Sequence, residues 1–197
     1  MCNTKKMDVN QEKIFKDWIK FLNPAEVKFN LISASIFITA YDNLISTVID
    51  KIKESYIDGF DENGYIINDD YKIQVKELYK KDIVIASLLW LENNNVITSE
   101  EVERVKIFKS HRNEIAHELS KILTDSDYSV RTEYIDEIKN ILFKIHKWWF
   151  TEFEMSINPE LGNLNIEELD FNEVLMLPML PVNYMLKIIN DEIKKRE

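Results

Sequence analysis

Two of the three histidines of this 197-residue chain lie in a ten-residue stretch, SHRNEIAHEL at residues 110–119, which also carries an arginine and an amide. A histidine takes up and releases protons near neutral pH because its reference pKa is about 6.5. An arginine is always charged and binds phosphate oxygens with two hydrogen bonds at once. His117 therefore suits proton transfer, Arg112 suits a bound phosphate, and Asn113 can orient the imidazole or hold a phosphate oxygen. We find no second cluster of this kind in the chain.

The stretch lies on a predicted helix that runs from about residue 98 to residue 123. Thr98, with Glu101 three residues later, has the form of a capping box that starts the helix. The apolar residues that follow recur at helical spacing and predict a buried stripe of Val105, Phe108, Ile115, Leu119 and Ile122. Polar residues gather on roughly the opposite side, namely Lys106, Ser110, Asn113, His117 and Ser120.

The spacing of the motif residues decides how they can meet. Asn113 and His117 are four residues apart, so they are neighbours on the helix surface. Arg112 and His117 are five apart, about 140° around the axis, and Arg112 falls close to the edge of the apolar stripe. One helix alone makes a loose pair of these two residues. Two copies of the helix that meet across a two-fold axis make a tighter site.

Arg112-Asn113, then three residues, then His117 resembles the Arg-x4-6-His signature of the HEPN superfamily (higher eukaryotes and prokaryotes nucleotide-binding). In that family the residue after the arginine is commonly polar, as Asn113 is. The resemblance implies a metal-independent endoribonuclease that leaves a cyclic phosphate, with Arg112 and His117 catalytic in a cleft shared by the subunits of a homodimer. Asn113 then has a supporting role, and His111, which lies outside the signature, is an additional contact.

The resemblance also implies a biological setting. HEPN ribonucleases act in toxin–antitoxin and phage-defence systems, so RNA is the expected substrate and a cognate antitoxin protein is an expected partner. Polar residues on a neighbouring helix can face the motif in such proteins, which makes Asp42 and Asn43 candidates for contacts to it. Many HEPN-like proteins are non-catalytic binding modules, and the second hypothesis is such a helical interaction protein.

The motif residues also have structural interpretations. Arg112 borders the apolar stripe and can pair with a carboxylate on an adjacent helix, and His117 can join a local hydrogen-bond network. His146, beside Trp148 and Trp149, is typical of a structural histidine among aromatic rings.

Composition predicts an all-α fold, an antiparallel bundle of about five to six helices formed by residues 1–197 as one domain. Hydrophobic residues make up 45% of the chain, and Gly 3 and Pro 4 are few. The net charge of −10 argues against unspecific binding of nucleic acid, which needs a basic surface. Residues 98–123 are locally neutral, with five acids and five bases.

Few residues are suited to a metal or a disulfide. The chain has three histidines, one cysteine and no His-x-x-x-His or Cys-x-x-Cys pair, so we expect no metal and no cofactor. The single cysteine, Cys2, excludes an internal disulfide and favours a reducing compartment. We expect no membrane span and no secretion signal, which makes the cytoplasm the predicted location.

Periodicity places the remaining elements along the chain. Residues 10–22 predict a first helix with Ile14, Trp18, Ile19 and Leu22 inward. Asn23-Pro24 starts a long central helix to about residue 56. Asn63-Gly64 predicts a type I′ turn in a short hairpin or loop insertion near residues 57–69. Helices are expected at 71–92, 131–155 and from Pro181 to the end.

An irregular acidic segment at about 156–181 interrupts the helical pattern before the C-terminal helix. Residues 148–186 hold seven acids and no Lys or Arg. The segment is either a solvated lid over the bundle or an acidic flap that occupies the motif until a partner displaces it.

Overall fold

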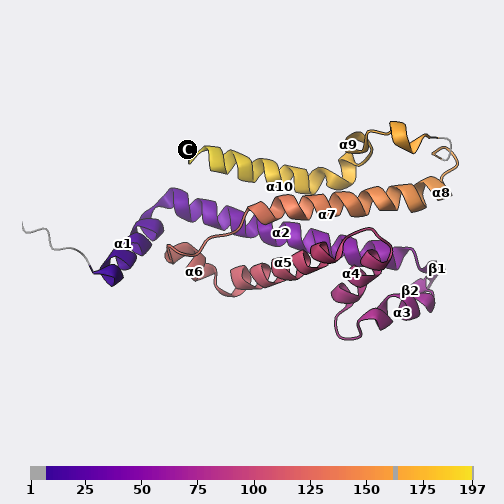
Figure 1. Ribbon diagram of the computed structural model, residues 1–197, viewed down its shortest axis with the longest axis horizontal. Helices are drawn as coiled ribbons and strands as arrows, with labels where there is room; N and C mark the ends of the chain where they lie inside the picture. The colour runs from indigo at the N-terminus through magenta and orange to yellow at the C-terminus, as the bar shows by residue number, and fades with distance from the viewer. Residues whose placement is uncertain (1–7, 162–163, 197) are drawn as a thin grey trace, which may run out of the picture.

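The computed structural model describes residues 8–161 and 164–196, and its helices form an elongated bundle (Figure 1). Successive long helices reverse direction, from α2 (Pro24–Glu54) to α5 (Ser99–His117), α7 (Glu133–Trp149) and α10 (Met176–Lys194). Helices α1 (Val9–Leu22) and α4 (Ile83–Asn93) complete the set of helices of eleven or more residues in the described part of the chain. The predicted all-α bundle with a hairpin insertion is confirmed.

Helix α2 is the central element, and it packs against α1, α4, α5, α6 (Leu119–Thr124), α7 and α10. It begins where the sequence predicts, because the Asn23 side chain accepts hydrogen bonds from the N–H groups of Ala25 and Glu26. Its buried side chains recur at helical spacing and form the middle of the core: Ala34, Phe37, Ala40, Tyr41, Leu44, Val48 and Ile52.

By length and composition alone, α2 also qualifies as a helix that could cross a membrane, whereas the sequence predicted no membrane span. In the bundle, 39% of the most apolar 18-residue segment of α2 is buried, and the helix packs against six other helices.

The hairpin lies where expected, with β1 (Ile57–Asp61) antiparallel to β2 (Gly64–Ile67). The predicted type I′ turn centred on Asn63-Gly64 is wrong. Asp61 pairs with Gly64, so Glu62 and Asn63 form the turn, and Gly64 follows it with a φ of 116°. The Asp61 carboxylate accepts the Asn63 N–H at 2.8 Å, which holds the turn in this alternative form.

The helix predicted at 71–92 is divided into α3 (Asp70–Gln74), the 3-10 turn η1 (Lys76–Leu78) and α4. Helix α4 starts anew because the Asp82 carboxylate accepts the Val84 N–H at 2.9 Å. The same carboxylate binds Lys109 Nζ of α5 at 2.6 Å, which ties the start of α4 to the motif helix.

Helix α5 begins with the predicted capping box. Thr98 Oγ1 accepts the Glu101 N–H at 3.3 Å, and Glu101 Oε2 accepts the Thr98 N–H at 2.9 Å.

Replacing Thr98 with alanine is expected to lower the free energy of unfolding by about 1 kcal/mol, because the Glu101 N–H at the helix start loses its side-chain acceptor. Urea denaturation of Thr98→Ala beside Ser99→Ala measures this effect. Ser99 is an exposed neighbour, and an equal loss in both variants would show that the cap has no special role.

The predicted helix at 98–123 is interrupted directly after His117. Glu118 adopts φ −118° and ψ 27°, which ends α5, and α6 follows with a changed direction. Val105, Phe108, Ile115 and Ile122 are buried as predicted, whereas Leu119 is 38% exposed. The break turns Leu119 away from the core stripe and leaves His117 as the last residue of the motif helix.

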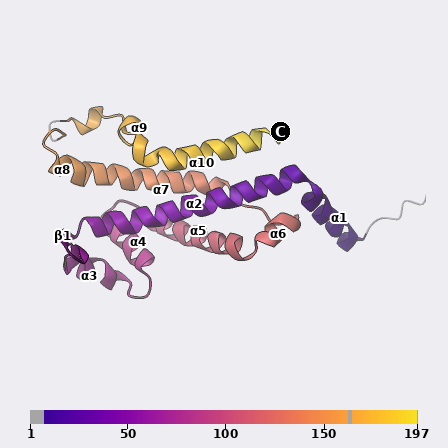
Figure 2. The ribbon, with the colours of Figure 1, turned by 180° about the vertical axis from the view of Figure 1, so that it is seen from behind.

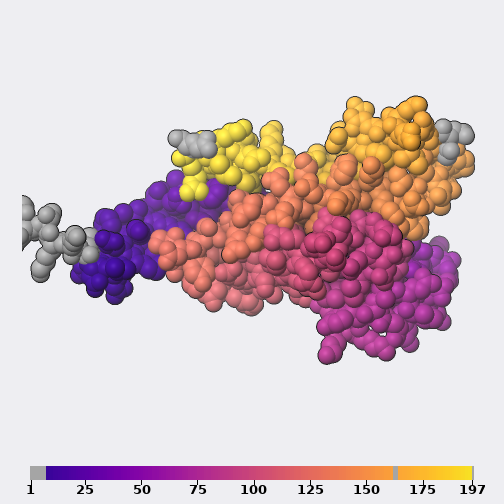
Figure 3. Space-filling view, viewed as in Figure 1, coloured from indigo at the N-terminus to yellow at the C-terminus, as the bar shows by residue number. Residues whose placement is uncertain are grey.

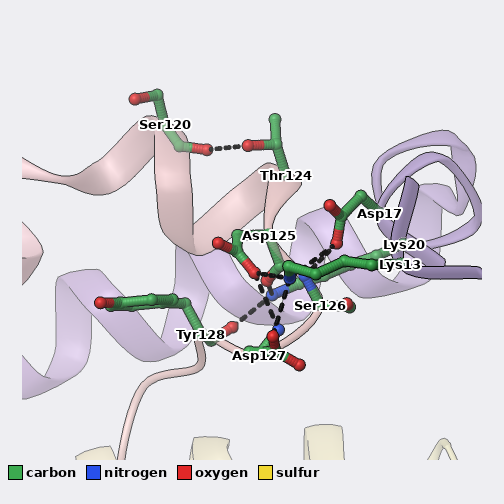
Figure 4. A network of polar contacts seen from close by, with 9 residues as sticks. All are labelled: Lys13, Asp17, Lys20, Ser120, Thr124, Asp125, Ser126, Asp127 and Tyr128. Atoms are coloured by element: carbon green, nitrogen blue, oxygen red, sulfur yellow. Dashed lines mark hydrogen bonds and ion pairs between the residues drawn. The ribbon is translucent and has the colours of Figure 1, made fainter. Parts of the chain in front are cut away.

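Helix α1 faces the bundle with the side opposite to the one predicted. The four residues expected inward, Ile14, Trp18, Ile19 and Leu22, are all exposed. Lys13, Asp17 and Lys20 instead face the bundle, because they bind the chain between α6 and α7 (Figure 4).

The C-terminal part contains short helical segments: η2 (Phe150–Glu154), α8 (Met155–Ile157), η3 (Ile166–Glu168) and α9 (Phe171–Val174). Helix α10 begins at Met176, earlier than predicted, and Pro181 lies inside it rather than at its start. Helices α8 and α9 lie at the end of the bundle opposite to α6 (Figures 1 and 2).

Candidate functional site

The polar face of α5 predicted from the sequence exists and is open to solvent. Lys106, Ser110, Asn113 and His117 are all exposed, and Ser120 continues the exposed surface on α6. The core side of α5 packs on α2 through Phe108 and Ile115, which fixes the rotation of the helix. His117 and Asn113 are thus held on a rigid element and can reach a ligand from solvent.

Arg112 lies at the boundary between this face and the contact with α2. Its side chain is 35% exposed, and its Nε lies 3.8 Å from Asp42 Oδ1 on α2. Among the described residues, Nε is buried without a hydrogen-bond partner. Asp42 itself is 55% exposed on its side chain. Arg112 is therefore close to a carboxylate but does not form the two short hydrogen bonds that a structural arginine forms.

Arg104, two helical turns earlier, provides the comparison. Its Nε and Nη2 each donate to a carboxylate oxygen of Glu137 at 2.6 Å, and its guanidinium lies 4.9 Å from the ring centroid of Tyr134. Both hydrogen bonds raise the pKa of Arg104. Arg104 joins α5 to α7 with two donors on one carboxylate, whereas Arg112 makes no such pair and retains donor capacity for an anion.

Asp42 and Asn43 are the two residues of α2 expected to face the motif. Of these, Asp42 is the one whose carboxylate lies near Arg112. Tyr41 lies beside it in the core, and burial, with Asp42 as a further cause, raises its pKa to about 12. Tyr41 therefore stays a neutral phenol at physiological pH and does not serve as a base. Nothing in the sequence pattern singled out this tyrosine, because an apolar helix face places aromatic residues in the core whether or not a site is near.

His111 does not join the exposed face. It is 5% exposed, its ring packs at 4.8 Å from that of Phe37, and its Nε2 accepts the Arg131 N–H at 3.0 Å. Because Nε2 is an acceptor, Nδ1 carries the proton and points to Glu114 Oε2 at 3.3 Å. Burial lowers the pKa of His111, which favours this neutral form. We therefore leave His111 out of the candidate site and assign it to the core.

His146 is also structural in its surroundings. It lies on α7, and burial together with the charge of Lys51 lowers its pKa to about 4. A histidine that stays neutral throughout the physiological range cannot alternate between base and acid there.

The acidic segment does not cover the motif. His117 ends α5 next to α6, whereas α8 and α9 lie at the other end of the bundle (Figures 1 and 2). In its described residues, 156–161 and 164–181, the acidic segment predicted at about 156–181 does not form a flap over the motif of the same copy.

Within one copy, the structure brings Asn113 and His117 together and directs Arg112 toward α2 and Asp42. The three residues border one another on α5 but do not enclose a ligand from several sides. A phosphate held by Arg112 and reached by an imidazole needs a second surface, as the five-residue spacing already indicated.

Comparisons of the chain with protein-family models, with curated proteins and with solved structures gave no match.

Proposed function

We propose that the protein is a metal-independent endoribonuclease of the HEPN type, in which two copies contribute Arg112 and His117 to a shared cleft. The observation that supports this most is the contrast between the two arginines of α5. Arg104 donates two hydrogen bonds of 2.6 Å to Glu137, whereas Arg112 Nε lies 3.8 Å from Asp42 Oδ1 without a hydrogen bond. Arg112 directly precedes the exposed Asn113 and lies five residues before His117.

The chemistry follows from the residue types. An imidazole removes the proton of the ribose 2′-hydroxyl, and the 2′-oxygen attacks the adjacent phosphorus. Arg112 stabilises the negative charge that gathers on the phosphate oxygens. The bond from phosphorus to the 5′-oxygen breaks, and the imidazolium formed in the first step gives its proton to that oxygen. The products are a 2′,3′-cyclic phosphate and a 5′-hydroxyl end, with no metal and no oxidant required.

Asn113 and Asp42 have positioning roles in this proposal. Asn113, one turn before His117, holds the imidazole or a phosphate oxygen. Asp42 keeps the Arg112 guanidinium near the edge of α5 until a phosphate, with more acceptor oxygens, replaces it.

The acidic character of the protein restricts the substrate. A net charge of −10 disfavours unspecific contact with RNA, so cleavage depends on the neutral surface of the motif helix. A toxin–antitoxin or phage-defence role remains part of the proposal through the family resemblance alone, as does a cognate antitoxin.

The test uses the purified full-length protein with a mixed RNA substrate in EDTA. Wild type is expected to produce fragments that end in cyclic phosphate, and Arg112→Ala is expected to lose this activity. Lys106→Ala is the matched control, since it removes a positive charge from the exposed face of the same helix. Equal cleavage by all three proteins would contradict the proposal.

A second candidate function, a non-catalytic binding protein, is favoured by the exposed apolar surface on α10. Leu177, Leu180 and Tyr184 are 72%, 56% and 61% exposed and share one helix face. Absence of cleavage by wild type, together with capture of a basic partner that Leu180→Gln abolishes, would support this function instead.

A further inference from the structure

Helix α1 exposes the side of an amphipathic helix that proteins normally bury. Its six large apolar residues after Val9 are each 44–68% exposed: Ile14, Phe15, Trp18, Ile19, Phe21 and Leu22. None of the fourteen residues of the helix is buried. A surface helix usually turns such residues to the core and its charges to water, so α1 is inverted.

Polar contacts fix this inverted orientation (Figure 4). Lys13 Nζ lies 2.6 Å from Asp125 Oδ1 and 2.8 Å from Asp127 Oδ2, and Asp17 Oδ1 accepts the Ser126 N–H at 2.7 Å. Lys20 Nζ also donates to the backbone oxygens of Asp125 and Tyr128. We call these contacts the α1 clasp.

The clasp shifts the titration of Lys13 and Asp17 toward the charged forms, whereas burial lowers the pKa of Lys20. Hydrogen bonds to Asp125 and Asp127 raise the pKa of Lys13, and the bond from Ser126 lowers the pKa of Asp17. The apolar residues therefore point outward because the charged residues of the same helix are occupied on the inner side. Ile14, Trp18 and Phe21 also line a hollow together with Asp17 and Thr124 of α6, which can receive a side chain of a partner.

We propose that the exposed apolar face of α1 is the surface through which a second copy of this chain binds. Two copies of a protein with a net charge of −10 repel each other, so they associate best through a surface without net charge. Residues 8–22 meet this condition, with three acids and three lysines. The apolar surface around α10 does not, since residues 156–186 have five acids and no Lys or Arg.

The size of the patch also suits a symmetric dimer. The three half-exposed aromatic rings alone offer about 300 Å² of surface, from roughly 150–250 Å² for a whole aromatic side chain. With the three aliphatic residues beside them, the patch supplies the apolar centre of an interface that needs about 800 Å² from each partner. Two such helices crossing on a two-fold axis present the same residues to each other.

The position of α1 links this surface to the candidate site. Helix α1 packs on α6, which follows directly after His117, and both lie at the same end of the bundle (Figures 1 and 2). Figure 3 shows α1 projecting from that end, beyond the body formed by the other helices. Contact through α1 therefore brings the ends of the two copies that carry His117 toward each other. This link depends on the proposed function, whereas the dimer surface itself does not.

A lipid surface fits α1 less well. Helices that lie on membranes place lysines on the outer polar side, where they attract anionic headgroups. In α1, Lys13 and Lys20 point inward and are bound to the 125–128 segment.

The test measures the mass of the full chain in solution by sedimentation over a concentration series. Wild type is expected to dimerise, and the double variant Ile14→Gln/Trp18→Gln is expected to raise the dimer dissociation constant by about 30-fold or more, as loss of a central Trp contact usually does. The matched control Leu177→Gln/Leu180→Gln removes equally exposed apolar residues from α10 and is expected to leave the dimer intact. Circular dichroism of each variant verifies that the helices remain formed.

Cysteine cross-linking provides a second measurement that does not require the apolar residues to be lost together. In a Cys2→Ser background, Ile14→Cys, Trp18→Cys and Leu22→Cys are oxidised separately, with Leu180→Cys as control. A covalent dimer from at least one α1 position, and none from the control, supports the proposal. A monomeric wild type, a dimer unaffected by the α1 variant, or wild type that binds anionic vesicles as a monomer through Trp18 would overturn it. A dimer that the α1 variants leave unaffected overturns the α1 interface alone, whereas a monomeric wild type also contradicts the two-copy cleavage site.

Discussion

Replacing His117 with alanine is expected to lower the rate of RNA cleavage by ~10²–10⁴-fold, the usual contribution of a general base or acid. His117 is exposed at the end of α5, and its replacement removes the only imidazole on the exposed face of that helix. The folded state has little dependence on it, so the thermal midpoint of the variant is expected to match that of wild type. Single-turnover cleavage of a labelled RNA in EDTA, with product ends identified by mass, gives the measurement.

Two further variants provide cleavage rates with which the rate of His117→Ala is compared. Asn113→Ala, which alters only a positioning residue, is expected to cost about tenfold. Lys106→Ala leaves the motif untouched and should cleave at close to the wild-type rate. Unchanged cleavage by His117→Ala would remove the imidazole from the mechanism and leave the binding-protein hypothesis.

The second large effect concerns stability against acid. The pKa of His146 falls from 6.5 to about 4 on folding, because of burial and the nearby charge of Lys51. Between these two values the unfolded chain binds a proton that the folded protein does not bind. Stability therefore decreases as the pH falls from about 6.5 to 4, by up to about 3 kcal/mol. Urea midpoints of wild type and His146→Gln at several pH values test this, and the variant should show a much weaker decrease.

The buried histidines and the paired carboxylates change the stability of the protein over different pH ranges. Asp17, Asp82 and Asp125 also have lowered pKa values, so their stabilisation is lost only below about pH 4. His111, whose pKa is lowered by burial, contributes in the same direction as His146 and leaves a residual slope in the variant. His117→Gln serves as control, since both buried histidines remain. Equal slopes in wild type and His146→Gln would show that His146 does not drive the acid response.

Local sequence signals predicted much of the fold. The Asn23 cap, the Thr98 capping box and the apolar stripe of α5 each depend on neighbouring residues only, and each lies where expected. The hairpin also lies in its predicted place, although the Asp61 side chain shifts the turn by one residue.

The orientation of α1 shows where periodicity fails. An apolar stripe indicates that one side of a helix will be covered, but it does not say by which chain. Lys13 and Asp17 find their partners in the 125–128 segment, more than a hundred residues away, and no local pattern indicates such contacts.

The candidate site was predictable in type and less so in geometry. Asn113 and His117 share an exposed face because four residues make nearly one turn. His111 is buried with its Nε2 bound to the N–H of Arg131, which lies just before α7. Arg112 lacks a close hydrogen bond because Asp42 on α2 lies 3.8 Å from its Nε. Both are consequences of packing between helices distant in sequence.

A purified heterodimer of Arg112→Ala and His117→Ala tests most directly whether two copies form one cleavage site. Two affinity tags on the coexpressed chains isolate the mixed species from both homodimers. If each site takes its arginine from one copy and its imidazole base from the other, one of the two sites is intact, and we predict about half the wild-type cleavage rate. A heterodimer no more active than either variant alone would contradict a site shared in this way.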